Sequence, residues 1–517
     1  MAKICLCLTG KTIKRNLEIL NKYRKFADMV ELRVDCLEDD ERLYIRHFPE
    51  QAGIPAIITI RRDVDGGYFV GGEGARVKLM ARGLAYANDD HRNNFAYMDI
   101  EEDFNVPSLE EAARTFGTRI IRSCHNLQGV TNDIPAKIKS MQRAGDEIVK
   151  MAVSVKNTND VLKLYQFSKA TKGKDKIFIC MGHYGIFSRI LAERFGSFLT
   201  YSSALSEHEV PGAPGQIDVK ELAELYHFRK ITKKTKIFGV VGNPLKASVS
   251  PWFFNNVFSL ENNDAVYVPF PTNSVGDFFT LAKELDVQGL SITVPYKESV
   301  LPYLAKRSPQ VLAIGACNTV YKSNDGWYGE NTDCKGFSDS LLQFIGKKNL
   351  KYLKVCIIGA GGVARAVAGE IYRLGGKAVI LNRTVHKAKN IAAQYKFKWG
   401  GLDDHGIEIM SKYNNIIIQT SSVGMEGYNE ENSSNDPLEL YSFSGKEAVM
   451  DLIYTPPVTP FLKRAAAAGC KTINGYDMVI RQACLQYGLF TGSEIPPQLL
   501  SRLATTGDNT WNKIRTG

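Results

Sequence analysis

The sequence has few features of a secreted, metal-binding or membrane protein. Its ten cysteines are scattered over 517 residues, with no Cys-x-x-Cys pair and no Cys/His set at zinc spacing. No apolar run approaches the length of a membrane span. The net charge is +10, yet no dense basic run is interleaved with aromatic residues. We therefore expect no metal site and neither nucleic acid nor membrane as a partner. The cysteines inside apolar runs indicate reduced core residues.

What is present is a long chain with ample apolar content. A hydrophobic fraction of 44% is ordinary for a globular protein, and the length predicts about three domains. The first apolar run begins at Ile4, which leaves no room for a signal or transit peptide, so we expect a cytoplasmic protein. A plastid enzyme that lacks its transit peptide would give the same sequence.

Short β-rich runs alternate with helical stretches through residues 1–225. The runs are Ile4–Leu8, Met29–Arg33, Ala56–Ile60, Phe95–Ile100, Thr118–Ser123, Ile148–Val153, Ile177–Met181 and Leu199–Ser203. This alternation predicts a (β/α)8 barrel, with an open doubly wound sheet as the alternative. A barrel requires functional residues at the C-terminal ends of its strands. Polar residues do stand at those ends, namely Glu31, Arg33, Arg61, His125, Arg189 and Gln216.

Lys150 is unusual because its neighbours in the sixth run are apolar. A lysine in a buried strand either pairs with an acid or stays neutral, and a neutral amine can form a Schiff base with a ketone. A lysine that snorkels from a strand end is the structural alternative. His125, one strand earlier, is suited to proton transfer, although a single histidine is more often structural.

These residues resemble type I 3-dehydroquinate dehydratases over essentially all of residues 1–225. Six motifs of that family occur in order, and they are Glu31/Arg33, Thr59/Arg61, Ser123/His125, Lys150, Met181–Arg189 and Ala213–Gln216. The resemblance implies that Lys150 forms an imine with the C3 ketone of 3-dehydroquinate. It implies that His125 takes a C2 proton and returns it to the departing C1 hydroxyl.

The same resemblance assigns the remaining residues of this first site. Arg189 would bind the substrate carboxylate, and the residues that hold hydroxyls and order the site would be Glu31, Arg33, Arg61, Asp65 and Gln216. Two positions depart from the family pattern. Asp65 replaces a longer glutamate, which keeps the charge, and Gly212 replaces a loop serine, which removes one hydroxyl contact.

A glycine cluster follows the apolar run 355–358. The spacing Gly359-x-Gly361-x-x-Ala364 predicts a strand, a tight turn and a helix start that binds a pyrophosphate. The next apolar run ends at Asn382-Arg383-Thr384, where no carboxylate stands to hold a ribose 2′-hydroxyl. Arginine suits a 2′-phosphate, so this region predicts NADP binding.

Polar loop residues between the barrel and the glycine cluster form a second candidate set. Ser248 and Ser250 precede an expected helix near Pro251 and could bind a carboxylate, although serines in loops are usually caps. Three further side chains on loops could bind hydroxyls and transfer a proton, and they are Lys297, Asn318 and Asp333. A surface ion pair of lysine and aspartate is the alternative.

From about residue 237 to the end, the chain resembles shikimate dehydrogenases. The matching motifs include Gly-Asn-Pro-x-x-x-Ser-x-Ser-Pro, Thr-Val-Pro-x-Lys, Asn-Thr-Asp-x-x-Gly and Asn-Arg-Thr. The resemblance implies that Lys297 and Asp333 handle the proton while hydride passes from NADPH to the ketone. The substrate-binding residues would be Ser248, Ser250, Thr293, Asn318, Tyr454 and Gln482. The cofactor-binding residues would be Gly359, Ala360, Gly361, Gly362, Ala364, Asn382, Arg383, Thr384, Lys387, Ser422, Gly424, Met425 and Gly475.

The shikimate dehydrogenase match also has departures. Ala247 stands where a histidine is usual in bacterial members, and Ser291 stands where an asparagine is frequent. Neither is the expected hydride or proton partner.

The two resemblances together predict a bifunctional shikimate-pathway enzyme. It would convert 3-dehydroquinate to 3-dehydroshikimate and then reduce the latter to shikimate. We expect a barrel over 1–228, a linker over 229–236, a shikimate-binding lobe over 237–339, a Rossmann NADP-binding lobe over 340–473, and C-terminal helices over 474–517 that return to the substrate lobe. A second half that acts on quinate stays open. More remote is a metabolite-sensing regulator, because such a protein would have lost Lys150, His125, Lys297 and Asp333.

Overall fold

The computed structural model describes residues 1–84, 90–143, 146–172, 175–207, 212–245, 248–426 and 435–505. The chain forms two compact units. One unit is Met1–Asn243 with Asn262–Val287, and the other is Pro244–Glu261 with Gln288–Gly517. The expected domain boundaries are finer than this division and stay predictions. Among the described residues, no helix is both long and apolar enough to cross a membrane.

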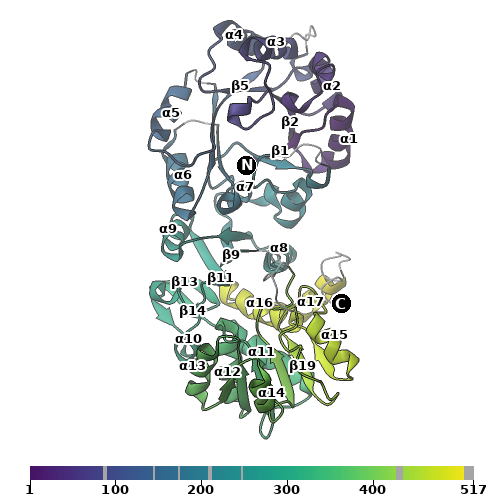
Figure 1. The fold of residues 1–517 in the computed structure, drawn as a ribbon. Coiled ribbons are helices and arrows are strands. Elements are labelled where there is room, and N and C mark those ends of the chain that lie inside the picture. Colours follow the sequence, from purple (N-terminus) through teal and green to yellow (C-terminus); the bar gives the residue numbers. More distant parts are fainter. Residues whose placement is uncertain are drawn as a thin grey trace. The chain divides into compact units, whose positions relative to one another are not determined.

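An eight-stranded parallel sheet dominates the first unit (Figure 1). Its strands are β1 (Lys3–Leu8), β2 (Met29–Arg33), β3 (Ala56–Thr59), β4 (Tyr97–Glu101), β5 (Arg119–Asn126), β6 (Ile148–Ser154), β7 (Lys176–Met181) and β8 (Leu199–Ser203). The strand order is β7-β6-β5-β4-β3-β2-β1-β8, so the first strand pairs with the last, with Lys3 opposite Leu199. At the other edge, the Phe198 amide, just before β8, donates a hydrogen bond to the carbonyl of Lys176 in β7 at 2.6 Å. This near-closure confirms the predicted barrel over the open sheet.

Helices follow most barrel strands and cover the outside of the sheet. They are α1 (Ile13–Tyr23), α2 (Phe48–Ala52), α3 (Glu73–Leu84), α4 (Pro107–Thr115), α5 (Ile134–Met141), α6 (Thr158–Ala170) and α7 (Phe187–Ile190). Their starts follow ordinary capping rules: the Thr12 side chain accepts from the Arg15 amide at α1, and the Asn157 side chain accepts from the Asp160 amide at α6. Apolar side chains from the strands fill the barrel interior.

The first unit continues past the barrel into a short parallel pair, β9 (Lys236–Gly242) and β10 (Ala265–Pro271), followed by α9 (Val275–Leu285). The segment expected to be a linker, 229–236, is packed rather than free. Arg229 lies 2.9 Å from Asp28, and the Thr235 hydroxyl donates to Asp264 at 2.6 Å.

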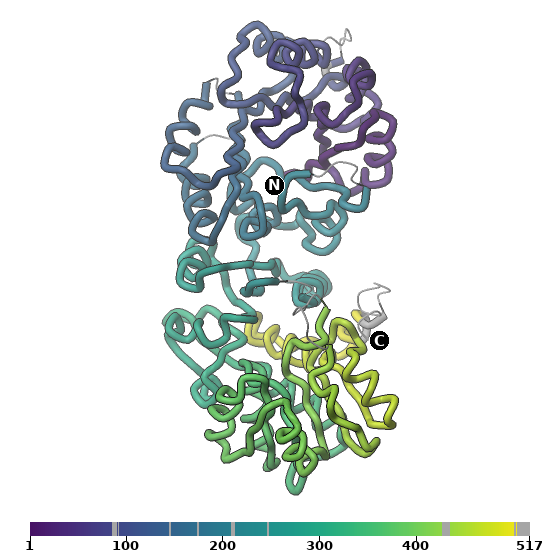
Figure 2. Tube along the Cα trace, viewed as in Figure 1, coloured from purple at the N-terminus to yellow at the C-terminus, as the bar shows by residue number. Residues whose placement is uncertain are grey.

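The second unit contains two groups of strands. The first comprises β11 (Val287–Ile292), β12 (Lys306–Arg307), β13 (Thr319–Ser323) and β14 (Gly326–Glu330), with α8 (Ser250–Leu260), α10 (Pro309–Ile314) and α11 (Thr332–Ile345). β13 pairs antiparallel with both β11 and β14. The C-terminal helices α16 (Tyr476–Thr491) and α17 (Pro497–Thr505) belong to the same unit. In Figure 2 the yellow C-terminal segment lies beside the green segment before it, and Phe490 of α16 contacts Phe254 of α8 at a ring-centroid distance of 5.6 Å.

The second group is a parallel six-stranded sheet with the order β17-β16-β15-β18-β19-β20. The strands are β15 (Lys354–Ile358), β16 (Lys377–Leu381), β17 (Lys398–Gly400), β18 (Ile416–Gln419), β19 (Ala448–Asp451) and β20 (Lys471–Ile473), and the helices are α12 (Gly362–Arg373), α13 (Val385–Tyr395), α14 (Asp404–Met410) and α15 (Pro460–Ala467). In chain order this is 3-2-1-4-5-6, the arrangement of dinucleotide-binding folds. The glycine cluster lies at the end of β15, where the strand order reverses. The predicted Rossmann fold is therefore confirmed.

Candidate active sites

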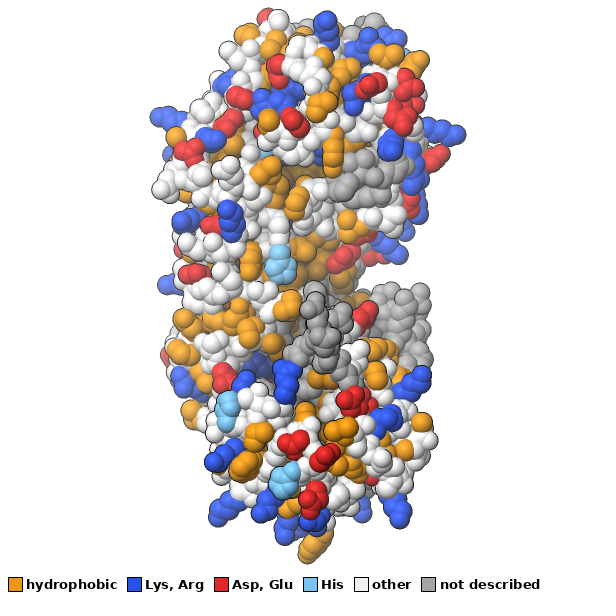
Figure 3. Space-filling view, viewed as in Figure 1, with side chains coloured by type: hydrophobic (Ala, Val, Ile, Leu, Met, Phe, Trp, Pro, Cys, Tyr) orange, Lys and Arg blue, Asp and Glu red, His pale blue; other side chains and the backbone are white. Residues whose placement is uncertain are grey.

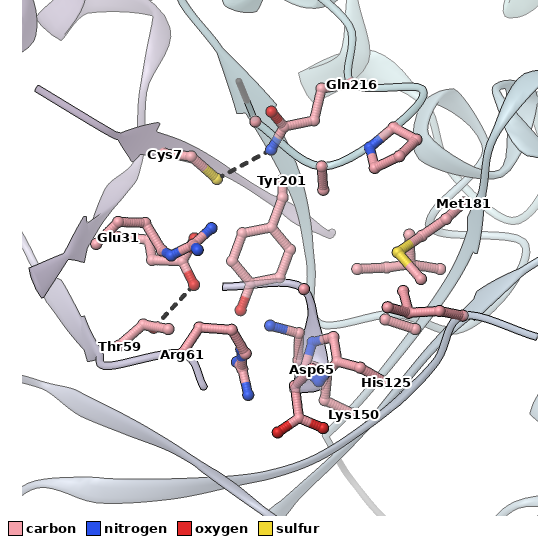
Figure 4. A pocket seen from close by; sticks show the side chains of 18 of the residues that line it. Cys7, Glu31, Thr59, Arg61, Asp65, His125, Lys150, Met181, Tyr201 and Gln216 are labelled. Carbon is pink, nitrogen blue, oxygen red and sulfur yellow. Dashed lines mark hydrogen bonds between the residues drawn. The ribbon is translucent and has the colours of Figure 1, made fainter. Parts of the chain in front are cut away.

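A cavity of about 290 Å³ opens at the C-terminal ends of the barrel strands. It is lined by all eight residues that the sequence predicts for the first site, which are Glu31, Arg33, Arg61, Asp65, His125, Lys150, Arg189 and Gln216. Figure 4 shows their labelled members converging from different strands on one space. The placement follows from the barrel, because parallel strands end at the same rim.

Lys150 is ion-paired inside this cavity. Its Nζ lies 2.7 Å from Asp99 Oδ2, and Asp99 also accepts from Arg61 Nη2 at 2.7 Å and from the Ser123 hydroxyl at 2.6 Å. Burial alone would raise the pKa of Asp99, but the charges of Arg61 and Lys150 outweigh burial and hold that pKa well below its usual value. Lys150 therefore has a buried acidic partner and does not snorkel from the strand end to the surface.

His125 contributes an uncharged base to the same cavity. Burial lowers the pKa of His125 well below its usual value, and the nearby charges of Arg61 and Lys150 lower it further. Its Nδ1 is buried without a hydrogen-bond partner among the described residues. A neutral imidazole with an unused nitrogen can accept a proton from a ligand.

Arg189 is a buried cation that no acidic side chain pairs with in the described part of the chain. Its guanidinium donates only to the backbone carbonyls of Tyr201 at 3.3 Å and Pro214 at 3.1 Å, and its Nε has no partner. Burial lowers the pKa of Arg189 to about 10. Buried charges are normally paired, so this arginine is suited to an anionic ligand such as a carboxylate.

The other predicted residues of the cavity are held by specific bonds. The Thr59 hydroxyl donates to Glu31 at 2.8 Å, and Gln216 Nε2 donates to the Cys7 sulfur at 3.3 Å, as the dashed lines in Figure 4 mark. Arg33 forms a two-point pair with Asp35, at 2.9 and 2.6 Å. The shortened acid Asp65 is tied to Arg62 at 2.6 Å. Gly212 also lines the cavity.

In the second unit, the predicted proton-transfer residues are in direct contact. Lys297 Nζ lies 2.6 Å from Asp333 Oδ2. Asn318 Nδ2 donates to Asp333 Oδ1 at 2.8 Å and to Gln482 Oε1 at 3.0 Å, which connects the first turn of α11 to α16. The pair is only slightly exposed, so it is not a surface ion pair. Ser291 donates to Gln486 at 2.8 Å.

The two serines predicted to bind a carboxylate, Ser248 and Ser250, lie at the start of α8. Ser250 is its first residue, and its backbone amide donates to the Ser248 hydroxyl at 3.3 Å. Tyr454 belongs to the same unit and is hydrogen-bonded to the Val249 backbone. Thr293 precedes the bend that leads to Lys297 and is half-buried. Ala247, the departure noted above, lies outside the described residues.

The glycine turn has the backbone that a dinucleotide site requires. Gly359 has φ +108, and a Cβ there would lie 2.5 Å from the Thr420 hydroxyl, so only glycine fits. A Cβ on Gly361 would meet nothing within 4 Å, which leaves the N-terminus of α12 open to a ligand. A Cβ on Gly362 would lie 3.5 Å from the Lys297 side chain, so the turn adjoins the proton-transfer pair.

The remaining residues predicted to bind the cofactor lie on several elements and differ in their exposure. Ala360 and Ala364 belong to the turn and the first turn of α12. Arg383 and Lys387 are exposed beyond β16, and the Asn382 side chain donates to the Thr384 carbonyl at 3.0 Å. Ser422, Gly424 and Met425 follow β18. Gly475 has a packing reason of its own, because a Cβ there would lie 2.1 Å from the Leu452 carbonyl.

No group of three His, Cys, Asp or Glu side chains could hold a metal ion in the described ranges. On the face drawn in Figure 3, basic and acidic side chains are interspersed.

Comparisons with known proteins cover almost the whole chain. The family model of type I 3-dehydroquinase matches residues 4–233, the shikimate dehydrogenase substrate binding domain matches 240–320, and shikimate / quinate 5-dehydrogenase matches 341–429. A bifunctional 3-dehydroquinate dehydratase/shikimate dehydrogenase of Arabidopsis thaliana, described as chloroplastic, is 30% identical over 520 residues, covering 96% of this chain and 83% of the relative. The chain belongs to this bifunctional family.

As a member of this family, the protein is both a lyase and an oxidoreductase of the shikimate pathway. A shikimate dehydrogenase (NADP(+)) of Caldanaerobacter subterraneus is 37% identical over 273 residues, which are 51% of this chain and 94% of the relative. A solved structure of the dehydroquinate dehydratase and shikimate dehydrogenase of S. pombe AroM is 24% identical, with a TM-score of 0.43, over 97% of this chain and 98% of that one.

Sequence reasoning missed several side chains of the dehydratase cavity. Asp99 and Glu101 hold Arg61 at 2.7 and 2.5 Å, and Tyr201 lies beside Lys150. A signal for the two acids was present, because they occupy alternate positions of a strand whose other residues are apolar. For Tyr201, a tyrosine between hydroxyl-bearing residues of β8, the sequence offers no comparable signal.

Proposed function

We propose that Lys150 and His125 perform the dehydration of 3-dehydroquinate in the barrel. The observation that carries this assignment is the cavity itself, which combines a buried lysine, an uncharged histidine and an arginine that pairs with no described acid. Arg189 binds the substrate carboxylate and so presents the C3 ketone to Lys150. Glu31 and Gln216 bind the hydroxyl groups of the substrate.

The charge state of the cavity determines how the reaction begins. The Lys150 ammonium must lose a proton before its nitrogen can attack C3. The pKa values of Asp99 and His125 are both lowered, so pKa does not choose between them; His125 is the one with a buried nitrogen that has no hydrogen-bond partner among the described residues. His125 is the neutral base in the same cavity. His125 passes two protons in turn from the Lys150 nitrogen to the C3 oxygen, which leaves as water as the C3=N bond forms. The histidine, neutral again, then removes a C2 proton and gives it to the C1 hydroxyl, which departs as water. Hydrolysis of the imine returns Lys150 and releases 3-dehydroshikimate, so one water is lost overall.

We assign the reduction of 3-dehydroshikimate to shikimate to Lys297 and Asp333. NADPH, when bound at the glycine turn, supplies the hydride. Lys297 adjoins that turn and donates a proton to the C3 oxygen, and Asp333 orients Lys297 from 2.6 Å. Ser248 and Ser250 bind the carboxylate, while Thr293, Asn318 and Gln482 hold hydroxyls. The exposed Arg383 and Lys387 suit the 2′-phosphate of NADP(H).

A cytoplasmic location, or a plastid for a chain without its transit peptide, agrees with ten free cysteines, nine of them buried.

A two-stage assay tests both assignments on the full chain. With 3-dehydroquinate alone, enone absorbance should rise; with NADPH added, NADPH should be consumed. Lys150→Ala should abolish enone formation and spare NADPH oxidation with 3-dehydroshikimate, while Lys297→Ala should do the reverse. Lys137→Ala, in a partly exposed pair with Glu102 at 2.8 Å, is the matched barrel control and should keep both activities. Borohydride with substrate should place an adduct on Lys150, and an adduct on another residue would overturn its role.

A further inference from the structure

Tyr201, on β8, has a buried hydroxyl that forms no hydrogen bond with the described residues. The residue is 4% exposed and lines the dehydratase cavity. Figure 4 shows its ring in the middle of the cavity, with the hydroxyl end directed toward Arg61 and Lys150.

Its position relative to the reacting amine is close. Lys150 Nζ lies 4.2 Å from the centroid of the Tyr201 ring, within the range of a cation–π contact. A phenylalanine would make the same ring contact and would avoid burying a lone hydroxyl, which is unfavourable when no partner exists. Neither packing nor the contact with Lys150 therefore explains the hydroxyl.

The hydroxyl can act only as a donor or a neutral acceptor. Burial raises the pKa of Tyr201 well above its usual value, and the charges of Glu31 and Asp99 raise it further. A phenol that stays protonated does not serve as a base. Its O–H is instead available to an oxygen that a ligand brings into the cavity.

We propose that Tyr201 donates a hydrogen bond to the C3 oxygen of 3-dehydroquinate while Lys150 attacks that carbon. The inference rests on the role proposed for Lys150. As the C3–N bond forms, the C–O π bond breaks and negative charge develops on the oxygen. A preorganised O–H in a buried site stabilises that charge without transferring its proton. The hydroxyl has no partner among the described residues because its partner arrives with the substrate.

Tyr201→Phe tests this role, since it removes only the oxygen. We expect kcat/KM for 3-dehydroquinate to fall about 10- to 100-fold, and borohydride trapping on Lys150 to slow in parallel. NADPH oxidation with 3-dehydroshikimate should be unchanged. Hydrogen–deuterium exchange in the barrel should be equal to or slower than in the wild type, because no protein hydrogen bond is lost.

Tyr97→Phe is the matched control. Tyr97 is a buried tyrosine of β4 outside the cavity lining. This variant should keep kcat/KM for 3-dehydroquinate within about twofold, since its hydroxyl does not line the cavity.

The possible results separate the two claims. A Tyr201→Phe enzyme with kcat/KM within twofold of the wild type overturns the inference about Tyr201 alone. So does a Tyr201→Phe barrel that exchanges faster than the wild-type barrel, because the hydroxyl would then be structural. A wild-type enzyme that forms no adduct on Lys150 overturns the proposed function of the cavity, and the inference about Tyr201 with it.

Discussion

Substituting asparagine for Asp99 tests the charge balance of the dehydratase cavity. The carboxylate lies 2.7 Å from Lys150 Nζ and 2.7 Å from Arg61 Nη2, all three being buried. Asparagine keeps the shape but removes the charge, so Lys150 loses its acidic partner, and Arg61 keeps Glu101 and the Ser123 hydroxyl. Removing one side of a buried ion pair costs about 3–5 kcal/mol. We expect Asp99→Asn to lower the free energy of unfolding of the barrel by about that amount at neutral pH.

This loss depends on pH in a direction that the lowered pKa of Asp99 determines. A carboxyl whose pKa falls on folding stabilises the folded state fully above its unfolded pKa of about 3.9, and loses that contribution as the pH falls below it. The difference between wild type and Asp99→Asn should be greatest above about pH 5. It should shrink by about 1.4 kcal/mol per pH unit below about pH 4.

Hydrogen–deuterium exchange of peptides from β4 to β6 measures barrel opening separately from the rest of the chain. Tryptophan fluorescence cannot do so, because all four tryptophans follow the barrel in the sequence. Asp103→Asn is the matched control. Asp103 also pairs with an arginine, Arg62 at 2.9 Å, but it is 60% exposed, so its loss should cost less than about 1 kcal/mol. Equal protection of β4–β6 in the two variants at neutral pH would refute the reasoning.

Three further predictions concern groups elsewhere in the two sites. Arg189→Gln should raise KM for 3-dehydroquinate about 10- to 100-fold while the borohydride adduct still forms on Lys150; an unchanged KM would exclude Arg189 as the carboxylate ligand. Arg383→Ser should raise KM for NADPH at least about tenfold and that for NADH less than about twofold, and equal effects in initial-rate assays would count against 2′-phosphate recognition. Burial raises the pKa of Asp451 to about 7, so the folded state loses stability as the pH rises from about 4 to 7. Asp451→Asn should slow exchange in β18 and β19 by up to about 4 kcal/mol at pH 8 and by little near pH 4, and the opposite trend would contradict the sign.

Most strands of the barrel and of the Rossmann sheet are predictable from sequence, because parallel strands that are buried on two faces are largely apolar along their length. β8 has the expected bounds, β4 starts at Tyr97 rather than Phe95, and β5 ends at Asn126 rather than Ser123. The choice between a barrel and an open sheet was not predictable in this way. It depends on the pairing of β1 with β8, whose residues are almost the whole barrel apart in sequence.

Charged residues on buried strands carry more information when they are considered as a set. Adjacent strands bring Glu101 opposite Ser123 and Ser123 opposite Lys150, so the acids of β4 lie within reach of the lysine of β6. A buried charge requires a partner. Asp99 in an apolar strand therefore indicates a buried ion pair as strongly as Lys150 does, and the two residues pair with each other. Arg189 has no such ion-pair partner among the described acidic side chains. A buried cation that remains after the described charges are paired is the position that we propose for the substrate carboxylate.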